Sequence, residues 1–277
     1  MGTVVGERLE ELRARCAPLT FAPLPELAAT APTGPGWSSA AELAAPGSAR
    51  LDELLKIAAA SAPAGPHAVH ALRTVLRELI FCVSTAVYLV DAAPSITADG
   101  YWCHAGGRTG VDRRLLVSPA TARVGGPPAS GGADVRVPST AALDAWVAEG
   151  FVATVAPLVD AVRAASRVGP RTLWGYVLDM LHFNPLSVAR QLGHDRTAAW
   201  ERAAALAEAL HAAGAPRFSR PELVRFGADP DEVWGVRGAC CLDFKEPTHG
   251  MCLTCPLLDA DARHAKWAAS TLRPTRR

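Results

Sequence analysis

The stretch PHAVHALRTVLRELIFCVSTAVYLV (residues 66–90) decides how this chain folds. Proline suits the first position of a helix because its φ is already helical and its missing N–H would have no partner there. The sequence therefore predicts a helix over 67–90. Its most apolar part, Leu79–Val90, covers about twelve residues, whereas a membrane-spanning helix needs about 20. It continues the pattern of Arg73, Arg77 and Glu78, so we interpret it as a helix buried in a globular core.

Helical spacing of apolar residues recurs on both sides of this stretch. Short segments separated by glycine pairs lie between the helical regions and indicate strands. The result is an α+β fold, predominantly helical, with a small mixed or antiparallel sheet. The predicted helices are Val5–Cys16, Ser48–Ser61, Thr140–Ala165, Arg171–His182, Thr197–Ala213 and a short one from the capping-box pattern at 219–222 to Phe226; the predicted strands are Ser95–His104, Leu115–Ser118, Val135–Val137 and Leu242–Phe244.

Composition narrows the function classes. The chain has 277 residues, 49% of them hydrophobic, which is enough for a sizeable core. The formal net charge is +1, so no strong field reaches toward nucleic acid or an anionic membrane. Charged residues such as Glu7, Arg8 and Glu11 interrupt the first twenty positions, where a secretory signal would need an apolar core. We expect a cytoplasmic protein that does not span the membrane, in which thiols stay reduced.

Four cysteines near the C-terminus form the pattern Cys-Cys-x10-Cys-x2-Cys, as Cys240, Cys241, Cys252 and Cys255. A Cys-x2-Cys turn brings two thiolates toward one point, and the preceding pair can fold back to meet it. Four thiolates are the usual ligand set of a 2Fe–2S cluster, but they also bind structural zinc. A redox dithiol at Cys252 and Cys255 is a third reading.

The adjacent pair imposes a geometric condition. Neighbouring side chains in a strand point to opposite faces, so both can be ligands only if the backbone bends there or if they reach different irons. Gly238 and Gly250 permit close backbone approach. Pro256 is expected to open a helix reaching about Ser270, whose N-terminal dipole would favour negative charge near Cys255.

These residues resemble the FhuF-like ferric-siderophore reductases, whose C-terminal signature is a Cys-Cys-x10-Cys-x2-Cys motif that binds a 2Fe–2S cluster. The Cys-Cys-Leu opening at 240–242 and the Cys-x2-Cys-Pro-Leu ending at 252–257 share the likeness. Upstream, Arg171-Thr172-Leu173-Trp174-Gly175 resembles the Leu-Trp-Gly helix start of these reductases and of the related siderophore synthetases. The two likenesses together cover about residues 171–258.

The resemblance implies a cytosolic iron–sulfur oxidoreductase that transfers one electron to siderophore-bound ferric iron and releases ferrous iron. All four cysteines then become ligands of a 2Fe–2S cluster. Residues 1–235 would form the α+β siderophore-binding region and residues 236–277 the cluster module. The substrate is guessed to be a hydroxamate siderophore. The chain lacks a Gly-x-Gly-x-x-Gly fingerprint for a nicotinamide or flavin, so the electron donor is expected to be another protein, such as a ferredoxin or a flavin reductase.

Three rival functions stay open: an iron or redox sensor, a siderophore-biosynthesis accessory protein, and a zinc-stabilised binding protein. A DNA-binding sensor would need a basic recognition helix, and the only basic cluster, Arg273, Arg276 and Arg277, looks solvated.

Several other residues have weaker signals. Arg171 could pair with an anionic siderophore, and Trp174 could stack on a ligand or simply fill the core. Arg237, Lys245 and His249 could tune a cluster potential or be solvated surface groups. The remaining candidates are expected to be ordinary core or surface residues: His67, His70, Cys103, His104, Cys16 and Cys82.

Overall fold

A computed structural model describes residues 4–61, 66–118, 120–125, 134–227, 229 and 232–270. The predicted basic cluster at 273–277 lies outside the described residues.

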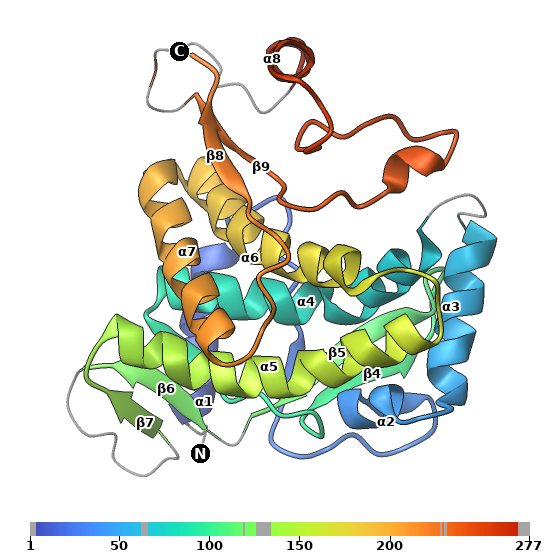
Figure 1. Ribbon diagram of the computed structural model, residues 1–277. Helices are drawn as coiled ribbons and strands as arrows, with labels where there is room; N and C mark the ends of the chain where they lie inside the picture. The colour runs from blue at the N-terminus through green and yellow to red at the C-terminus, as the bar shows by residue number, and fades with distance from the viewer. Residues whose placement is uncertain are drawn as a thin grey trace.

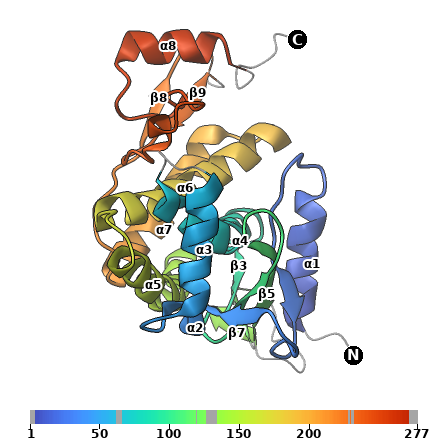
Figure 2. The same cartoon turned by 90° about the vertical axis from the view of Figure 1, so that its right-hand side faces the viewer.

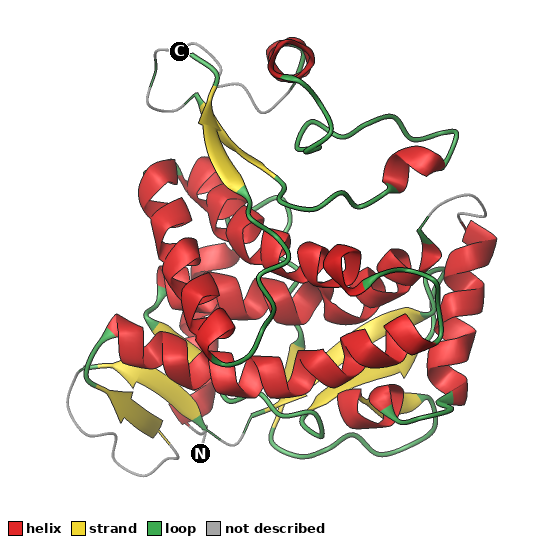
Figure 3. Cartoon of the chain, viewed as in Figure 1, coloured by secondary structure: helices red, strands yellow, loops and turns green. Residues whose placement is uncertain are grey.

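Helices dominate the described part of the chain, as predicted (Figures 1 and 3). Their bounds are α1 (Val4–Cys16), α2 (Ala40–Ala44), α3 (Ala49–Ser61), α4 (His67–Leu89), α5 (Thr140–Ala164), α6 (Pro170–Leu192), α7 (Arg196–Ala212) and α8 (Ala260–Ala268). Helix α6 runs well past the expected end at His182, and Pro185, which was expected to follow the helix, lies inside it and is buried. Helix α2 was not predicted; it begins with a capping box between Ser39 and Glu42.

Three small sheets complete the described part of the fold, and the α+β class with small mixed and antiparallel sheets is confirmed. The mixed four-stranded sheet has the order β1 (Glu26–Ala28), β5 (Val111–Val117), β4 (Tyr101–Ala105) and β2 (Trp37–Ser39), with only the β1–β5 pair parallel. The second sheet has the order β3 (Ala92–Pro94), β6 (Thr121–Val124) and β7 (Asp134–Val137). The third is the antiparallel pair β8 (Glu222–Arg225) and β9 (Val233–Val236).

Helix α4 forms the centre of the main core. Nearly every residue on one broad face of it is buried, from Ala68 to Leu89. It packs against α6, α5 and α3, and Tyr101 of β4 reaches it with a hydroxyl that donates to the Val75 carbonyl at 2.7 Å. The interpretation of residues 79–90 as part of a buried helix is therefore confirmed.

Helix α5 is, by length and composition alone, the one helix in the described ranges that could cross a membrane. Half of its apolar window is buried in the molecule, and Phe151 and Val155 belong to the main core. A core helix of a folded protein meets the same criterion.

The C-terminal elements project from the helical body. Figures 1 and 2 show β8, β9 and α8 beyond the ends of α6 and α7. A separate apolar cluster joins them to α6 through Phe183 and Leu186, which contact Trp234 of β9 and Trp267 of α8. The predicted boundary after residue 235 falls inside β9, and the division into two units stays a prediction.

Three local predictions in this region are wrong. The capping-box segment 219–226 contains strand β8 instead of a helix, because the Ser219 hydroxyl donates to Asp179 and residues 222–225 pair with β9. The segment Leu242–Phe244 is not a strand but leads into a 3₁₀ turn, η1 (Asp243–Lys245). The last helix begins at Ala260 with Asp259 as its N-cap, not at Pro256.

Candidate metal centre

Strand β9 delivers the chain to the first cysteine pair through Arg237, Gly238 and Ala239. Asp179 of helix α6 fixes this approach: its carboxylate accepts the amide of Gly238 at 3.0 Å and that of Ala239 at 3.4 Å. The Ser219 hydroxyl donates to the same carboxylate at 2.5 Å. Asp179 is 1% exposed, and burial raises its pKa to about 6. The backbone leading to Cys240 is thus anchored on the helical body.

Gly175 explains why α6 can lie so close to this backbone. A Cβ atom on Gly175 would stand 2.2 Å from the Cβ of Ala239, far inside contact distance. The Leu-Trp-Gly stretch identified in the sequence therefore lies directly against the residue before Cys240. Gly238 is similarly confined, since a Cβ there would meet the backbone of Arg220 at 2.1 Å.

The backbone bends immediately after the adjacent cysteines Cys240 and Cys241. Leu242 has a left-handed conformation with φ of 62°, which few non-glycine residues adopt. The chain then enters η1, where the Asp243 carboxylate contacts His70 at 2.8 Å and Arg73 at 3.2 Å, both on α4. Burial opposes the charge on Asp243, but His70 and Arg73 hold its pKa well below the usual range. These ion pairs tie the far side of the cysteine segment to the core.

The second cysteine pair folds back beside the first. The amide of Arg237 donates to the Thr254 carbonyl at 2.9 Å, and a turn between Cys252 and Cys255 closes with a 3.1 Å backbone hydrogen bond. The thiols then face one another in two cross-pairs: Cys252 acts on the pKa of Cys241, and Cys240, after burial, contributes to the raised pKa of Cys255. In the described ranges, no three or more His, Cys, Asp or Glu side chains form a closed metal-ligand group; the four thiols stand as two pairs.

Two of the four sulfurs accept a hydrogen bond from the protein. The amide of Leu242 donates to Cys240 at 3.4 Å, and the hydroxyl of Thr254 donates to Cys252 at 3.5 Å. The backbones of Asp243 and Leu257 act in the same direction on the other two, because they favour the charged forms of Cys241 and Cys255 and oppose the rise of pKa that the surroundings of these thiols cause. Such donors stabilise negative charge on sulfur, which is what a thiolate bound to metal carries.

The electrostatics favour an anion at this point. The interaction between Cys252 and Cys241 lowers the pKa of Cys252 to about 6. The same interaction, together with burial, raises the pKa of Cys241. Burial opposes the charge on Arg237, yet the facing Cys241, Cys252 and Asp179 raise its pKa. Its Nε–H group is buried and has no hydrogen-bond partner among the described residues. This orphaned donor on a residue that faces Cys241 and Cys252 fits a site that takes up further sulfur or thiolate charge.

The donor set suits two kinds of metal group. Two sulfurs arrive from each of two antiparallel chain segments, with the adjacent pair on one and the Cys-x2-Cys turn on the other. Four thiolates of this kind can hold a 2Fe–2S cluster or a zinc ion.

The weaker candidates are distributed as follows. Arg171 is exposed on the first turn of α6. Trp174 is 6% exposed and belongs to the main core, the alternative considered for it. Lys245 and His249 are exposed, but the interpretation of Arg237 as a solvated surface charge is wrong, because the chain folds over it. Cys16, Cys82 and Cys103 are buried.

Sequence reasoning missed the anchors of the site. Asp179 and the His70–Arg73–Asp243 contacts join residues far apart in the chain, and no local pattern marked them. Gly175 was identified with the Leu-Trp-Gly stretch, but its close packing against Ala239 was not predicted. His70 was expected to be an ordinary surface histidine, and only the fold places Asp243 against it.

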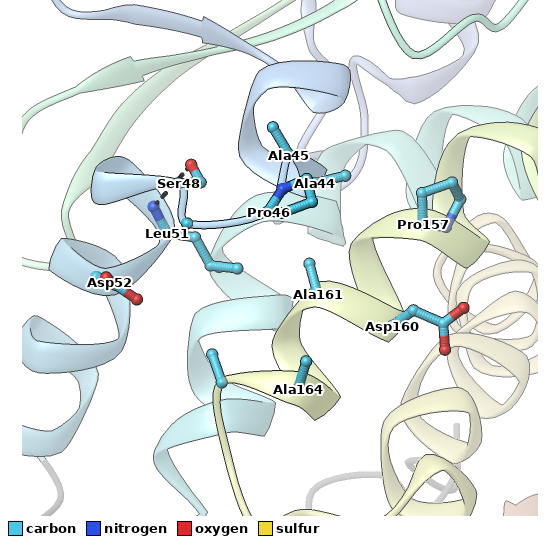
Figure 4. Close-up of a pocket in the computed structure, with 12 residues that line it drawn as sticks. Ala44, Ala45, Pro46, Ser48, Leu51, Asp52, Pro157, Asp160, Ala161 and Ala164 are labelled. Carbon is cyan, nitrogen blue, oxygen red and sulfur yellow. Dashed lines mark hydrogen bonds between the residues drawn. The ribbon is translucent and has the colours of Figure 1, made fainter.

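The pockets on the described surface include two of more than 500 Å³. One, of about 560 Å³, lies between the α2–α3 connection and α5 and is lined largely by alanine and proline (Figure 4). The other, of about 540 Å³, is lined by Leu242 and Lys245 of the cysteine segment together with residues at the starts of α4 and α6. Only the second adjoins the candidate metal centre.

Comparison of the chain with models of known protein families and with curated proteins gave no match.

Proposed function

We propose that this protein is an iron–sulfur reductase that passes one electron to siderophore-bound ferric iron in the cytoplasm. The observation that supports it best is the arrangement of Cys240, Cys241, Cys252 and Cys255 in two facing pairs, with a hydrogen-bond donor on the sulfurs of Cys240 and Cys252. The likeness of the cysteine motif to the ferric-siderophore reductases supplies the reaction.

The four cysteines would hold a 2Fe–2S cluster, which accepts and donates single electrons when bound. Siderophores bind ferric iron through hard oxygen ligands, and the less charged ferrous ion is held far more weakly. One-electron reduction is therefore by itself a release step, and it needs no general acid, base or nucleophile.

The surrounding residues would set how readily the site takes an electron. Arg237 contributes a half-buried positive charge that faces Cys241 and Cys252, and the amide of Leu242 stabilises negative charge on the Cys240 sulfur. Both effects would favour the reduced state of a bound cluster and raise its reduction potential. The anchors at Asp179 and Asp243 would hold this arrangement rigid between the two oxidation states.

The test is spectroscopy on protein purified without oxygen, with assays for iron, sulfide and zinc. We expect a red-brown protein with about two irons and two sulfides that gives an S = 1/2 paramagnetic signal on reduction. Addition of a ferric siderophore should then re-oxidise it. A colourless protein that holds zinc would remove the electron-transfer function and support the zinc-stabilised binding protein instead.

A cluster that is present but is not re-oxidised by any ferric siderophore would point to the sensor or the biosynthesis accessory. The physiological electron donor is proposed to be a ferredoxin or a flavin reductase, and reduction by purified candidates in the presence of their own reductants would identify it.

A further inference from the structure

The pocket beside the cysteine segment has an unusual charge character. Its volume is about 540 Å³, within the range of small-ligand sites. Three of its lining residues are basic, namely His67, Arg167 and Lys245, and no described lining residue is acidic. Arg167 and Lys245 are exposed, so both side chains are free to reach a ligand in the pocket.

Two long helices begin at the same pocket. Pro66 and His67 of α4 line it, as do Gly169 and Thr172 of α6, and each helix has 23 residues. Both helix starts lie within the described residues; neither has a side-chain N-cap hydrogen bond or an acidic residue in its first turn. The positive ends of the two helix dipoles are therefore not offset by acidic residues of the helices themselves; Asp243 contacts His70 on the first turn of α4, and the start of α6 has no such contact among the described ion pairs.

The pocket also adjoins the candidate metal centre through the covalent chain. Leu242 lines it, follows Cys241 directly, and donates its amide to the Cys240 sulfur. A ligand seated here is separated from the thiols by little more than this one residue. The exposed Lys245 lies on the same turn.

From these three observations we propose that this pocket binds a small ligand with several negative charges, namely a ferric chelate with free carboxylates. The identification of the ligand as the electron acceptor rests on the proposed reductase function. Arg167 and Lys245 bind its carboxylates, and the starts of α4 and α6 supply backbone N–H groups. The site therefore prefers a polycarboxylate chelate over a neutral hydroxamate one.

The first experiment measures binding of citrate to the purified full-length protein by calorimetry. We expect saturable binding that weakens with rising salt concentration, because the attraction is electrostatic. Arg167→Gln and Lys245→Gln should each weaken it about tenfold, the effect of one charge-assisted hydrogen bond. Arg108→Gln is the matched control: it removes an exposed arginine from the β4–β5 turn and should leave binding unchanged.

Thr172→Phe tests the pocket as a space, since it fills the cavity and leaves both cations in place. Loss of citrate binding in this variant, with the melting temperature unchanged, supports the assignment. No citrate binding by the wild type, or equal weakening by Arg108→Gln and Lys245→Gln, would overturn it.

The second experiment separates this inference from the proposed function. Chemically reduced protein is mixed with ferric citrate or with a neutral ferric trihydroxamate, and the rate of re-oxidation is followed. Lys245→Gln should slow the reaction with ferric citrate about tenfold and leave the hydroxamate reaction nearly unchanged. Equal slowing of both would contradict the pocket assignment. A zinc-containing protein that still binds citrate through Arg167 and Lys245 would retain the anion pocket and lose the reductase function.

Discussion

The carboxylate of Asp179 accepts the backbone amide of Gly238 at 3.0 Å, and this contact joins helix α6 to the chain that enters the cysteine motif. Asp179 is buried and also receives the Ser219 hydroxyl. The Asp179 carboxylate thus accepts three hydrogen bonds, from the Ser219 hydroxyl and from the amides of Gly238 and Ala239. The position of the first cysteine pair depends on a residue that lies well outside the motif.

The pH dependence of folding should report on Asp179. Burial raises its pKa from 3.8 to about 6, so between these pH values the folded protein binds this proton more tightly than the unfolded chain does. The contribution of Asp179 to the free energy of unfolding therefore falls as pH rises from about 4 to about 6, and the difference corresponds to about 3 kcal/mol. Urea unfolding of wild type and Asp179→Asn between pH 4 and 7 checks this. Asp179→Asn should lack the Asp179 contribution, so its free energy of unfolding should change less steeply than that of the wild type between about pH 4 and about pH 6.

Asp160→Asn is the matched control, since that carboxylate is largely exposed on α5. It should follow the wild-type profile. Parallel profiles for wild type and Asp179→Asn would show that Asp179 does not take up a proton in this range.

Gly175→Ala should destabilise the protein by about 1 to 3 kcal/mol, the usual cost of overpacking. The new Cβ would stand 2.2 Å from that of Ala239, so helix α6 and the cysteine segment must separate. Thermal unfolding and metal content measure the effect. The double variant Gly175→Ala with Ala239→Gly removes the opposing Cβ and should recover most of the loss; no recovery would show that the contact is not the cause.

Cys252→Ala should abolish normal metal uptake, because it removes one of the four sulfurs of the proposed ligand set. Cys16→Ala is the matched control, since Cys16 is a buried thiol on α1 and is absent from the cysteine motif. It should retain full metal content. Iron, sulfide and zinc assays on both variants measure this, and equal metal content in the two would contradict the ligand assignment.

Asp243→Asn should loosen the turn that follows the cysteine pair. It leaves His70 and Arg73 without their anionic partner, and we expect a loss of about 1 to 2 kcal/mol and faster release of the metal to a chelator. Asp112→Asn removes a comparable partner from His104, at 2.9 Å on β4 and β5, and should leave metal release unchanged. Identical release rates in the two variants would exclude a role for the His70–Asp243 contact in holding the site.

The sequence by itself determined the elements whose signals are local. Apolar periodicity over 67–90 predicted the buried helix that became α4, and the spacing of Cys252 and Cys255 predicted the tight turn between them. These features depend on side chains within one or two helical turns, which is the distance over which sequence patterns carry information.

Only the tertiary structure decided how those elements meet. The helix predicted at 219–226 does not form, because residues 222–225 pair with 233–236 and satisfy their backbone hydrogen bonds in a strand. The Ser219 hydroxyl donates to Asp179 instead of capping a helix. The left-handed turn at Leu242 is held by contacts of Asp243 with α4, and the anion pocket exists because the starts of α4 and α6 converge beside that turn. Each of these results from hydrogen bonds or packing between segments distant in the chain, whose partners no local pattern specifies.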